Sequence, residues 1–414
     1  MTIPPPSRPS PARAEDAESS ARGFRARISL GRNLTAESST YFLVLGTTLF
    51  LVAIGLVMVL SSSSITSFVG EQGFFAGFWR QATFAAIGVP LMLVFSRFPV
   101  SFWKKWAWQA LALGALLQLL VFTPLGIETY GNRNWISIGG VTGQPSEFLK
   151  LALVVWIGYI LWKKRALLDR SMHALIPVLP VAGISIGLVL LGEDLGTVIV
   201  MSVVVMAALY FAELRLRTLL IPLVLGVALV AVMAITSPNR MGRIADFFEK
   251  SGSDYSGLSW QPLHGLWALA NGGVFGVGLG NSKAKWSWLP AADNDYIFAI
   301  IGEELGLIGA IVVILLYVLL AVGLLRVMRN ARDLFGVVTT GAVLVWIVGQ
   351  AFVNIGVVIG ILPVLGVPLP LLSSGGTALI SCLMAIGVVL SIARDSTNNP
   401  PEDTPTARPN QRTR

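Results

Sequence analysis

Long apolar segments decide what this chain can fold into. Each of them, at about 18 to 30 residues, is long enough to cross the hydrocarbon core of a bilayer as a helix. Only helices and closed barrels satisfy the backbone inside a membrane, and these segments lack the alternation of a barrel. The sequence therefore predicts an all-α polytopic membrane protein with about ten transmembrane helices, at 41–60, 78–98, 105–124, 146–163, 174–192, 195–212, 217–236, 295–324, 335–360 and 375–394.

Composition supports this class and excludes others. Hydrophobic residues make up 54% of the 414 residues, and charged residues only 13%, about half the roughly 25% of soluble domains. A secreted or cytosolic enzyme is excluded, and so is disorder as the main state. One cysteine, Cys382, excludes a disulfide framework and a thiolate cluster, and two histidines argue against a histidine-rich metal site.

The two ends differ from the middle and fix the predicted orientation. Residues 1–40, with six arginines, predict a disordered basic arm, residues 395–414 a second solvated tail, and residues 41–394 the membrane domain. An even number of spans with the arm inside places both termini in the cytoplasm. That orientation puts 22 of the 30 lysines and arginines on the cytoplasmic side. The net charge of +8 is then a topology signal, and we expect no nucleic-acid partner.

Two of the outward segments carry charge close to the membrane. In 131–150 we expect a turn and then a capped helix starting at Pro145, with Arg133 and Trp135 in the turn. Lys150 falls near the start of a span, where a charge is usually functional or paired. At the tip 192–197, Asp194 is either a helix cap or, if the tip enters the membrane, a carboxylate that needs a cation such as Lys150 or Arg133.

The third outward segment, 237–294, is a large extracytoplasmic loop between spans 7 and 8. Arg240, Arg243 and Lys250 fall on or beside an amphipathic surface helix predicted at 241–248. The glycine-rich run 272–280, followed by Lys283 and Lys285, suits either a re-entrant turn or a loop that binds a phosphate.

Carboxylates follow that loop. Asp295 opens the eighth span, either as a helix N-terminal residue or as a group facing a polar cavity, with Asp293 two residues before it. Glu303 and Glu304 lie deeper, near 80° and 180° around the helix from Asp295, so the three cannot share one face. Intramembrane acids are either functional or ion-paired. The uncharged, proline-rich segment 360–376 predicts a re-entrant wall.

Acidic and basic groups therefore collect at one membrane face, beside an apolar interior. The chain has no Walker motif, cofactor fingerprint or metal-ligand cluster, so we expect a substrate that carries its own activation. A polyprenyl-linked diphosphate sugar fits, because a carboxylate can take a proton from an acceptor hydroxyl while cations neutralise the diphosphate. A carrier that moves an anionic lipid would show the same charges.

Six sequence blocks, in the same order, resemble the SEDS family, which includes FtsW, RodA and SpoVE. They are NRNWI (132–136), PSEFLK (145–150), DLGT (194–197), GGVFGVGLGNSKAK (272–285), DYIFAIIGEELGLIG (295–309) and NIGVVIGILPVLGVPLPLLSSGG (354–376). The resemblance implies a peptidoglycan glycosyltransferase in the bacterial cytoplasmic membrane. Such an enzyme polymerises lipid II into β-1,4 glycan strands at the outer face, with a class B penicillin-binding protein of the FtsI type as transpeptidase.

Residue roles follow from the same resemblance. It implies that Asp295 is the general base of an inverting reaction. It also implies that the remaining matching polar positions bind substrate, with the cations on the diphosphate and Asp194 orienting them: Arg133, Trp135, Lys150, Asp194, Arg243 and Lys285. A divalent cation, Mg²⁺ or Mn²⁺, is expected to help without a readable site. This chain departs from the family at 291–294, where Asp293 adds a carboxylate and becomes a second candidate beside Asp295.

Three alternatives stay open. The long basic arm and polar tail favour the cell-division branch of the family, docked with other division proteins at the septum, over the elongation branch typified by RodA. The second alternative is a transporter that flips lipid II across the membrane. The third is a scaffold of the division complex without chemistry of its own.

Overall fold

All ten apolar stretches form helices in the computed structural model, which describes residues 38–398 apart from 70, 72, 130–131, 171, 237, 250–258 and 287–288. In the described residues, nine spans have 18 or more residues, and the tenth, α6, is apolar with 17. The predicted membrane fold is confirmed. Its spans are α1 (Ser39–Val69), α2 (Ala76–Arg97), α3 (Val100–Leu119), α4 (Pro145–Lys163), α5 (Met172–Leu190), α6 (Leu195–Phe211), α7 (Leu216–Thr236), α10 (Ile297–Arg329), α11 (Leu334–Leu344) continued by α12 (Gln350–Val358), and α13 (Gly376–Asn398).

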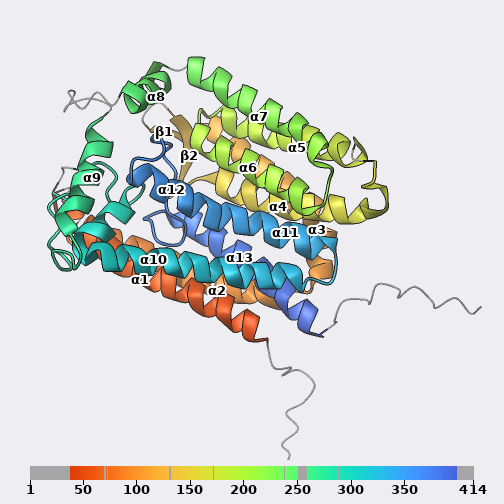
Figure 1. Cartoon of the computed structure of the whole chain (residues 1–414), viewed down its shortest axis with the longest axis horizontal. Coiled ribbons are helices and arrows are strands. Elements are labelled where there is room, and N and C mark those ends of the chain that lie inside the picture. The colour runs from red at the N-terminus through yellow and green to blue at the C-terminus, as the bar shows by residue number, and fades with distance from the viewer. Residues whose placement is uncertain are drawn as a thin grey trace, which may run out of the picture. The chain divides into compact units, whose positions relative to one another are not determined.

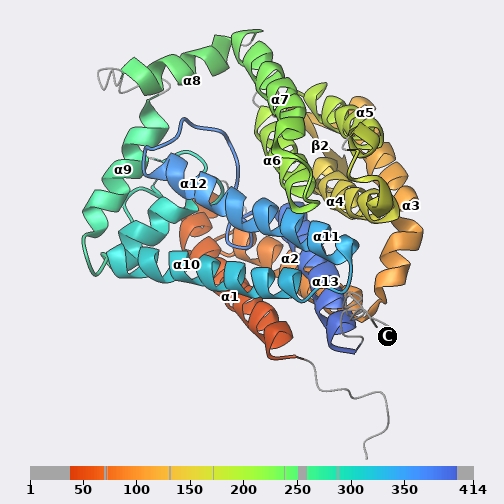
Figure 2. The ribbon, with the colours of Figure 1, turned by 45° about the vertical axis from the view of Figure 1, so that its right-hand side comes forward.

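The helices pack side by side, with α13 along α2, α3 along α4 and α1 along α10 (Figure 1). Three spans form the interior: α4, the α11–α12 span and α13 are mostly buried, whereas α7 is mostly exposed. Apolar side chains on the outer helices are exposed, as expected where lipid replaces water. Polar residues on the buried spans therefore have protein, rather than lipid, as their surroundings. Figure 2 shows the α11–α12 span between α10 and α6.

Both ends of the described chain lie at one end of the bundle. Residues of the start of α1, Ser38 and Thr40, line a small cavity together with Ser396 and Thr397 of α13. This arrangement requires an even number of crossings. The last helix extends to Asn398, four residues past the predicted boundary, while the predicted arm and tail lie almost wholly outside the described residues.

A small antiparallel sheet stands between α3 and α4, where the sequence analysis expected a turn and a capped helix. It consists of β1 (Gly126–Thr129), β2 (Asn132–Ile138) and β3 (Val141–Gly143), in the order β1-β2-β3, after the 3₁₀ turn Leu120–Phe122. Trp135 pairs with Ile127, and Ser137 with Thr142. The expectation was wrong because Trp135, Ile136 and Ile138 are residue types that favour strands, and Gly139-Gly140, both at positive φ, close the hairpin. The predicted helix after it, α4, does begin at Pro145.

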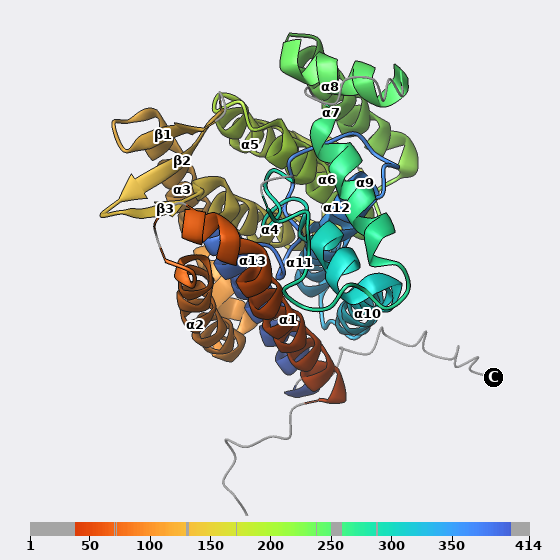
Figure 3. The ribbon, with the colours of Figure 1, turned by 90° about the vertical axis from the view of Figure 1, so that its left-hand side faces the viewer.

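The segment 237–294 contains two helices, α8 (Pro238–Glu249) and α9 (Trp260–Gly272), at the same end of the bundle as the sheet (Figures 1 and 3). Helix α8 is the amphipathic helix predicted at 241–248. Of its three predicted cations, Lys250 lies outside the described residues, and so does the side chain of Arg240. Helix α9 was not predicted.

The glycine-rich run after α9 inserts against a break in α10. Helix α10 loses its helical geometry at Gly306, and the amides of Val277 and Gly278 donate to the carbonyls of Glu303 and Glu304, each at 3.0 Å. A Cβ atom on Gly276 would lie 2.2 Å from the Glu304 carbonyl oxygen, so only glycine fits there. This packing is that of a re-entrant turn, and the two amides are used within the protein.

Both glutamates of α10 hold this glycine-rich segment, which we call the glycine loop (273–285). Glu304 forms an ion pair with Lys285 (Nζ to Oε1, 3.2 Å) and accepts from the Ser61 hydroxyl. Glu303 accepts from the Asn271 amide at 2.9 Å and from the hydroxyl of Ser282. Of the two alternatives for these intramembrane acids, the structure shows internal pairing.

Candidate active site

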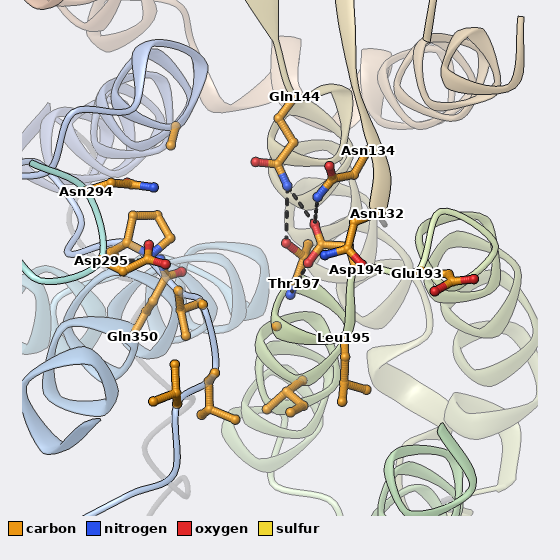
Figure 4. A pocket seen from close by; sticks show the side chains of 18 of the residues that line it. Asn132, Asn134, Gln144, Glu193, Asp194, Leu195, Thr197, Asn294, Asp295 and Gln350 are labelled. Atoms are coloured by element: carbon orange, nitrogen blue, oxygen red, sulfur yellow. Dashed lines mark hydrogen bonds between the residues drawn. The ribbon is translucent and has the colours of Figure 1, made fainter. Parts of the chain in front are cut away.

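A cavity of about 380 Å³ opens at the end of the bundle that carries the sheet, α8 and α9. Its wall combines β2, the start of α4, the α5–α6 turn, α8, the segment before α10, α12 and the re-entrant segment 360–375. Figure 4 shows Asn294, Asp295 and Gln350 on one side and Asn134, Gln144 and Asp194 on the other. Its polar or aromatic lining residues are Asn132, Asn134, Trp135, Gln144, Glu147, Lys150, Glu193, Asp194, Thr197, Arg243, Asn294, Asp295, Gln350 and Ser374.

Asp295 sits in a short segment whose backbone is held at three successive carbonyls. The amide of Ser374 donates to the carbonyl of Asp293 (2.8 Å), the hydroxyl of Ser373 to that of Asn294 (2.6 Å), and the side-chain amide of Asn354 to that of Asp295 (2.7 Å). The carboxylate itself lines the cavity, and its Oδ1 atom is buried without a hydrogen-bond donor. The segment 360–376, which the sequence predicted as a wall, thus also positions Asp295.

Burial makes Asp295 an unusually strong base for a carboxylate. Loss of solvent raises its pKa from 3.8 to about 6, because burial disfavours the charged form. The cation of Arg243 lowers this pKa, and the carboxylates of Asp293 and Asp194 raise it. A carboxyl group with a pKa near 6 is mostly ionised at neutral pH and still accepts a proton readily.

Asp194 is held by neutral donors. As N-cap of α6 it accepts from the Thr197 amide at 3.0 Å, and its other oxygen accepts from Asn134 at 3.0 Å and Gln144 at 2.6 Å. Of the two alternatives that the sequence left open for Asp194, the helix cap is confirmed. The other alternative, Lys150 or Arg133 as its partner, is not found, because amide side chains and a helix N-terminus supply the donors that a buried carboxylate needs.

Lys150 has its partner one turn away on its own helix. Its Nζ lies 2.8 Å from Glu147 Oε1 and 5.1 Å from the ring centre of Trp346, and both charged side chains are buried. Ser381 donates to the second oxygen of Glu147 at 3.1 Å. Both residues line the cavity, so the pair is available to a ligand while its net charge is zero.

The remaining predicted residues divide into two groups. Trp135, half-buried, and Arg243, exposed, line the cavity. The other three do not: the guanidinium of Arg133 donates to the Thr123 carbonyl at 2.9 Å, Lys285 lines a separate apolar groove beside α1, and Asp293 contributes its backbone carbonyl. The structure therefore brings together Asp295, Asp194, Arg243, Lys150 and Trp135.

The sequence analysis assigned no role to five amide side chains of the cavity: Asn132, Asn134, Gln144, Asn294 and Gln350. Gln350 carried a readable signal, because it is a polar residue in the middle of an otherwise apolar span. Asn134 and Gln144 carried none, since they lie in segments where amides are common.

The cavity contains more acids than bases, which bears on metal binding. Among the residues that the structure describes, no group of three or more His, Cys, Asp or Glu side chains is placed to hold a metal ion. With the described residues alone, a divalent cation would depend on ligands from a bound diphosphate.

Comparison with known proteins now gives these residues a context. Residues 41–398 match the model of the FtsW/RodA/SpoVE family, described as cell cycle proteins. The chain belongs to this family. The match covers every membrane span and the complete lining of the cavity.

Curated relatives agree along most of their length. A probable peptidoglycan glycosyltransferase FtsW of Mycobacterium tuberculosis is 35% identical over 89% of this chain and 71% of its own. The FtsW of Coxiella burnetii, also named a probable peptidoglycan glycosyltransferase, is 35% identical over 85% and 95%. Stage V sporulation protein E of Bacillus subtilis is 33% identical over 87% and 99%.

Solved structures share the fold. A chain of a peptidoglycan synthase complex superposes with a TM-score of 0.71 at 24% identity, covering 88% of this chain and 99% of that one. RodA of Thermus thermophilus gives 0.63 at 24% identity, with the same coverage. The arrangement of membrane helices in this FtsW/RodA/SpoVE protein is thus that of its family.

Proposed function

We propose that this protein polymerises lipid II into β-1,4 glycan strands at the outer face of the cytoplasmic membrane, during synthesis of the division septum. Membership of the FtsW/RodA/SpoVE family makes it a peptidoglycan glycosyltransferase. The observation that carries the mechanism is a carboxylate, Asp295, that lines the cavity, with a pKa raised to about 6 and a buried oxygen to which no described residue donates.

The reaction needs one base and one leaving-group site. Asp295 removes the proton from the acceptor sugar's hydroxyl while that oxygen bonds to the anomeric carbon of the donor. The bond from that carbon to the diphosphate breaks on the opposite side, and undecaprenyl diphosphate leaves with the electron pair. The α-linked donor becomes a β-linked product, and the proton passes from Asp295 to water.

Charge in the cavity defines where the diphosphate binds. Arg243, on the amphipathic helix α8, is exposed at the cavity, and Lys150 lies deeper, paired with Glu147. We assign both cations to the diphosphate and Trp135 to stacking on a sugar ring. Asp194 positions Asn134 and Gln144. A divalent cation, Mg²⁺ or Mn²⁺, would be held by the diphosphate and would supply extra positive charge there.

Partners follow from the same proposal. A class B penicillin-binding protein of the FtsI type crosslinks the strands as they form, and one related fold belongs to a peptidoglycan synthase complex. The basic arm and tail bind division proteins in the cytoplasm. The elongation role of a RodA-type enzyme is the alternative, and depletion distinguishes them: loss of a division enzyme gives filaments, and loss of an elongation enzyme gives spheres.

The decisive experiment compares two neighbouring acids. The assay uses the purified protein, its penicillin-binding partner and labelled lipid II. The Asp295→Asn variant should polymerise lipid II roughly 10²- to 10⁴-fold more slowly than the wild type, because a general base usually contributes that much to the rate. Asp293→Asn should stay within tenfold of the wild type, because its side chain does not line the cavity.

Unchanged glycan formation by Asp295→Asn would refute the mechanism. A wild-type protein that moves lipid II across vesicles without joining it would favour the transporter. Growth of cells that carry only Asp295→Asn would favour the scaffold.

A further inference from the structure

The α11–α12 span is interrupted where it reaches the cavity. Residues Val345–Gly349 form a π-helical turn, and Gln350 follows it directly. Turns of this kind often occur at functional sites, because the extra residue redirects the side chains after it. Gln350 and Asn354, four residues apart, share a helix face. Asn354 binds the carbonyl of Asp295, so this face adjoins the proposed base.

Among the described residues, only one end of the Gln350 side-chain amide has a hydrogen-bond partner. Its Nε2 donates to the carbonyl of Pro368 at 2.9 Å, which fixes which end of the amide is the nitrogen. Its Oε1 is buried without a donor, and the side chain is only 5% exposed. A buried acceptor without a partner destabilises the folded protein, because it has lost its hydrogen bonds to water. A methionine of similar size would avoid that cost. A ligand that donates a hydrogen bond to Oε1 therefore explains why a glutamine stands at this position.

Asn134 shows the same pattern on the opposite side of the cavity (Figure 4). Its Nδ2 donates to Asp194 at 3.0 Å, and its Oδ1 is buried without a donor. Together with Oδ1 of Asp295, three lining residues each present an acceptor oxygen that no donor of the described chain reaches. A carbohydrate is the matching ligand, because each ring carries several O–H groups and, in an amino sugar, an amide N–H.

We propose that Gln350 and Asn134 recognise the acceptor sugar: their carbonyl oxygens accept hydrogen bonds from its hydroxyl or amide N–H groups and hold its reactive hydroxyl against Asp295. This assignment rests on the proposed function and names the specificity-determining residues of the same site. The Asp194 carboxylate and the Pro368 carbonyl accept hydrogen bonds from these two amides and keep them oriented before the sugar arrives, which lowers the ordering cost of binding.

The test measures KM and kcat for labelled lipid II with Gln350→Met, which keeps the volume and removes the acceptor. We expect kcat/KM to fall roughly tenfold or more, with KM raised. Gln81→Met is the matched control: Gln81 is equally buried and donates to the Ser373 carbonyl of the same re-entrant segment at 3.0 Å, but does not line the cavity. It should lose thermal stability and keep the wild-type KM.

Gln350→Glu provides a second measurement that does not depend on the methionine variant folding. It keeps an acceptor oxygen and adds a negative charge beside Asp295, so the acid limb of the pH–rate profile should move to higher pH. A wild-type KM in Gln350→Met, or an unmoved limb in Gln350→Glu, would overturn this assignment while leaving the proposed function intact. A wild-type protein that forms no glycan would overturn both.

Discussion

Opposing effects on one carboxylate set the working range of the site. Burial of Asp295 and the neighbouring charges of Asp293 and Asp194 raise its pKa, while Arg243 lowers it, and the balance lies at about 6. A carboxyl group at its ordinary pKa would be a weaker base, and one with a pKa far above 7 would be protonated in the cell. The extra acid Asp293 therefore helps to tune the base without entering the cavity.

The pH dependence of polymerisation tests this balance. Only ionised Asp295 can accept the proton, so kcat/KM should rise as pH increases through about 6 and level off above it. Arg243→Gln removes a charge that favours the ionised form, so the acid limb should move to higher pH. Arg243→Lys keeps the charge and is the control. A limb near pH 4, or a shift to lower pH in Arg243→Gln, would contradict the assignment.

At the scale of elements, the glycine loop is held to α10 by charges within the membrane. Lys285 donates to the Gly280 carbonyl at 2.6 Å and pairs with Glu304, which also accepts from Ser61 on α1. This network ties three elements together outside the cavity. The family resemblance implied a diphosphate role for Lys285, whereas its contacts support an anchoring role.

Paired substitutions separate these two roles. Lys285→Met leaves the charge of Glu304 buried and alone, and should destabilise the fold by about 3–5 kcal/mol. Adding Glu304→Gln removes that charge, so the double variant should recover most of the lost stability and keep the wild-type KM for lipid II. Thermal unfolding in detergent and the polymerisation assay are the measurements. A double variant that is stable but has a raised KM would restore Lys285 to the substrate site.

Helices were readable from the sequence because hydropathy is a local property, whereas most side-chain partners were not. Ser61 and Glu304 meet across 243 positions, and Asp194 and Gln144 across 50. No local pattern in the sequence indicates which residues so far apart along the chain contact each other. Lys150 has its partner Glu147 only three residues away, but an acid in the first turn of a helix also suits the helix dipole, so the sequence alone does not distinguish the two roles. The sheet was missed because its strands have at most seven residues.

At the scale of the molecule, the two ends of the helical bundle carry different features. One end holds both ends of the described chain and Arg326 and Arg329 in the last turn of α10. The other holds the sheet, α8, α9 and the cavity (Figure 1). Positive charge near the first end predicts that it is cytoplasmic, and we therefore expect the cavity to open outward, where glycan strands are needed. The position of the cavity and the proposed reaction therefore depend on one orientation.

Single cysteines test that orientation in intact cells. The native Cys382 is buried in α13, so the unchanged chain should resist a membrane-impermeant maleimide. Thr142→Cys, exposed on β3 at the cavity end, should be labelled from outside. Asn330→Cys, exposed at the end of α10, should be labelled only after the membrane is permeabilised. The reverse pattern would place the cavity in the cytoplasm, where no glycan strand is assembled, and would exclude polymerisation at the outer face.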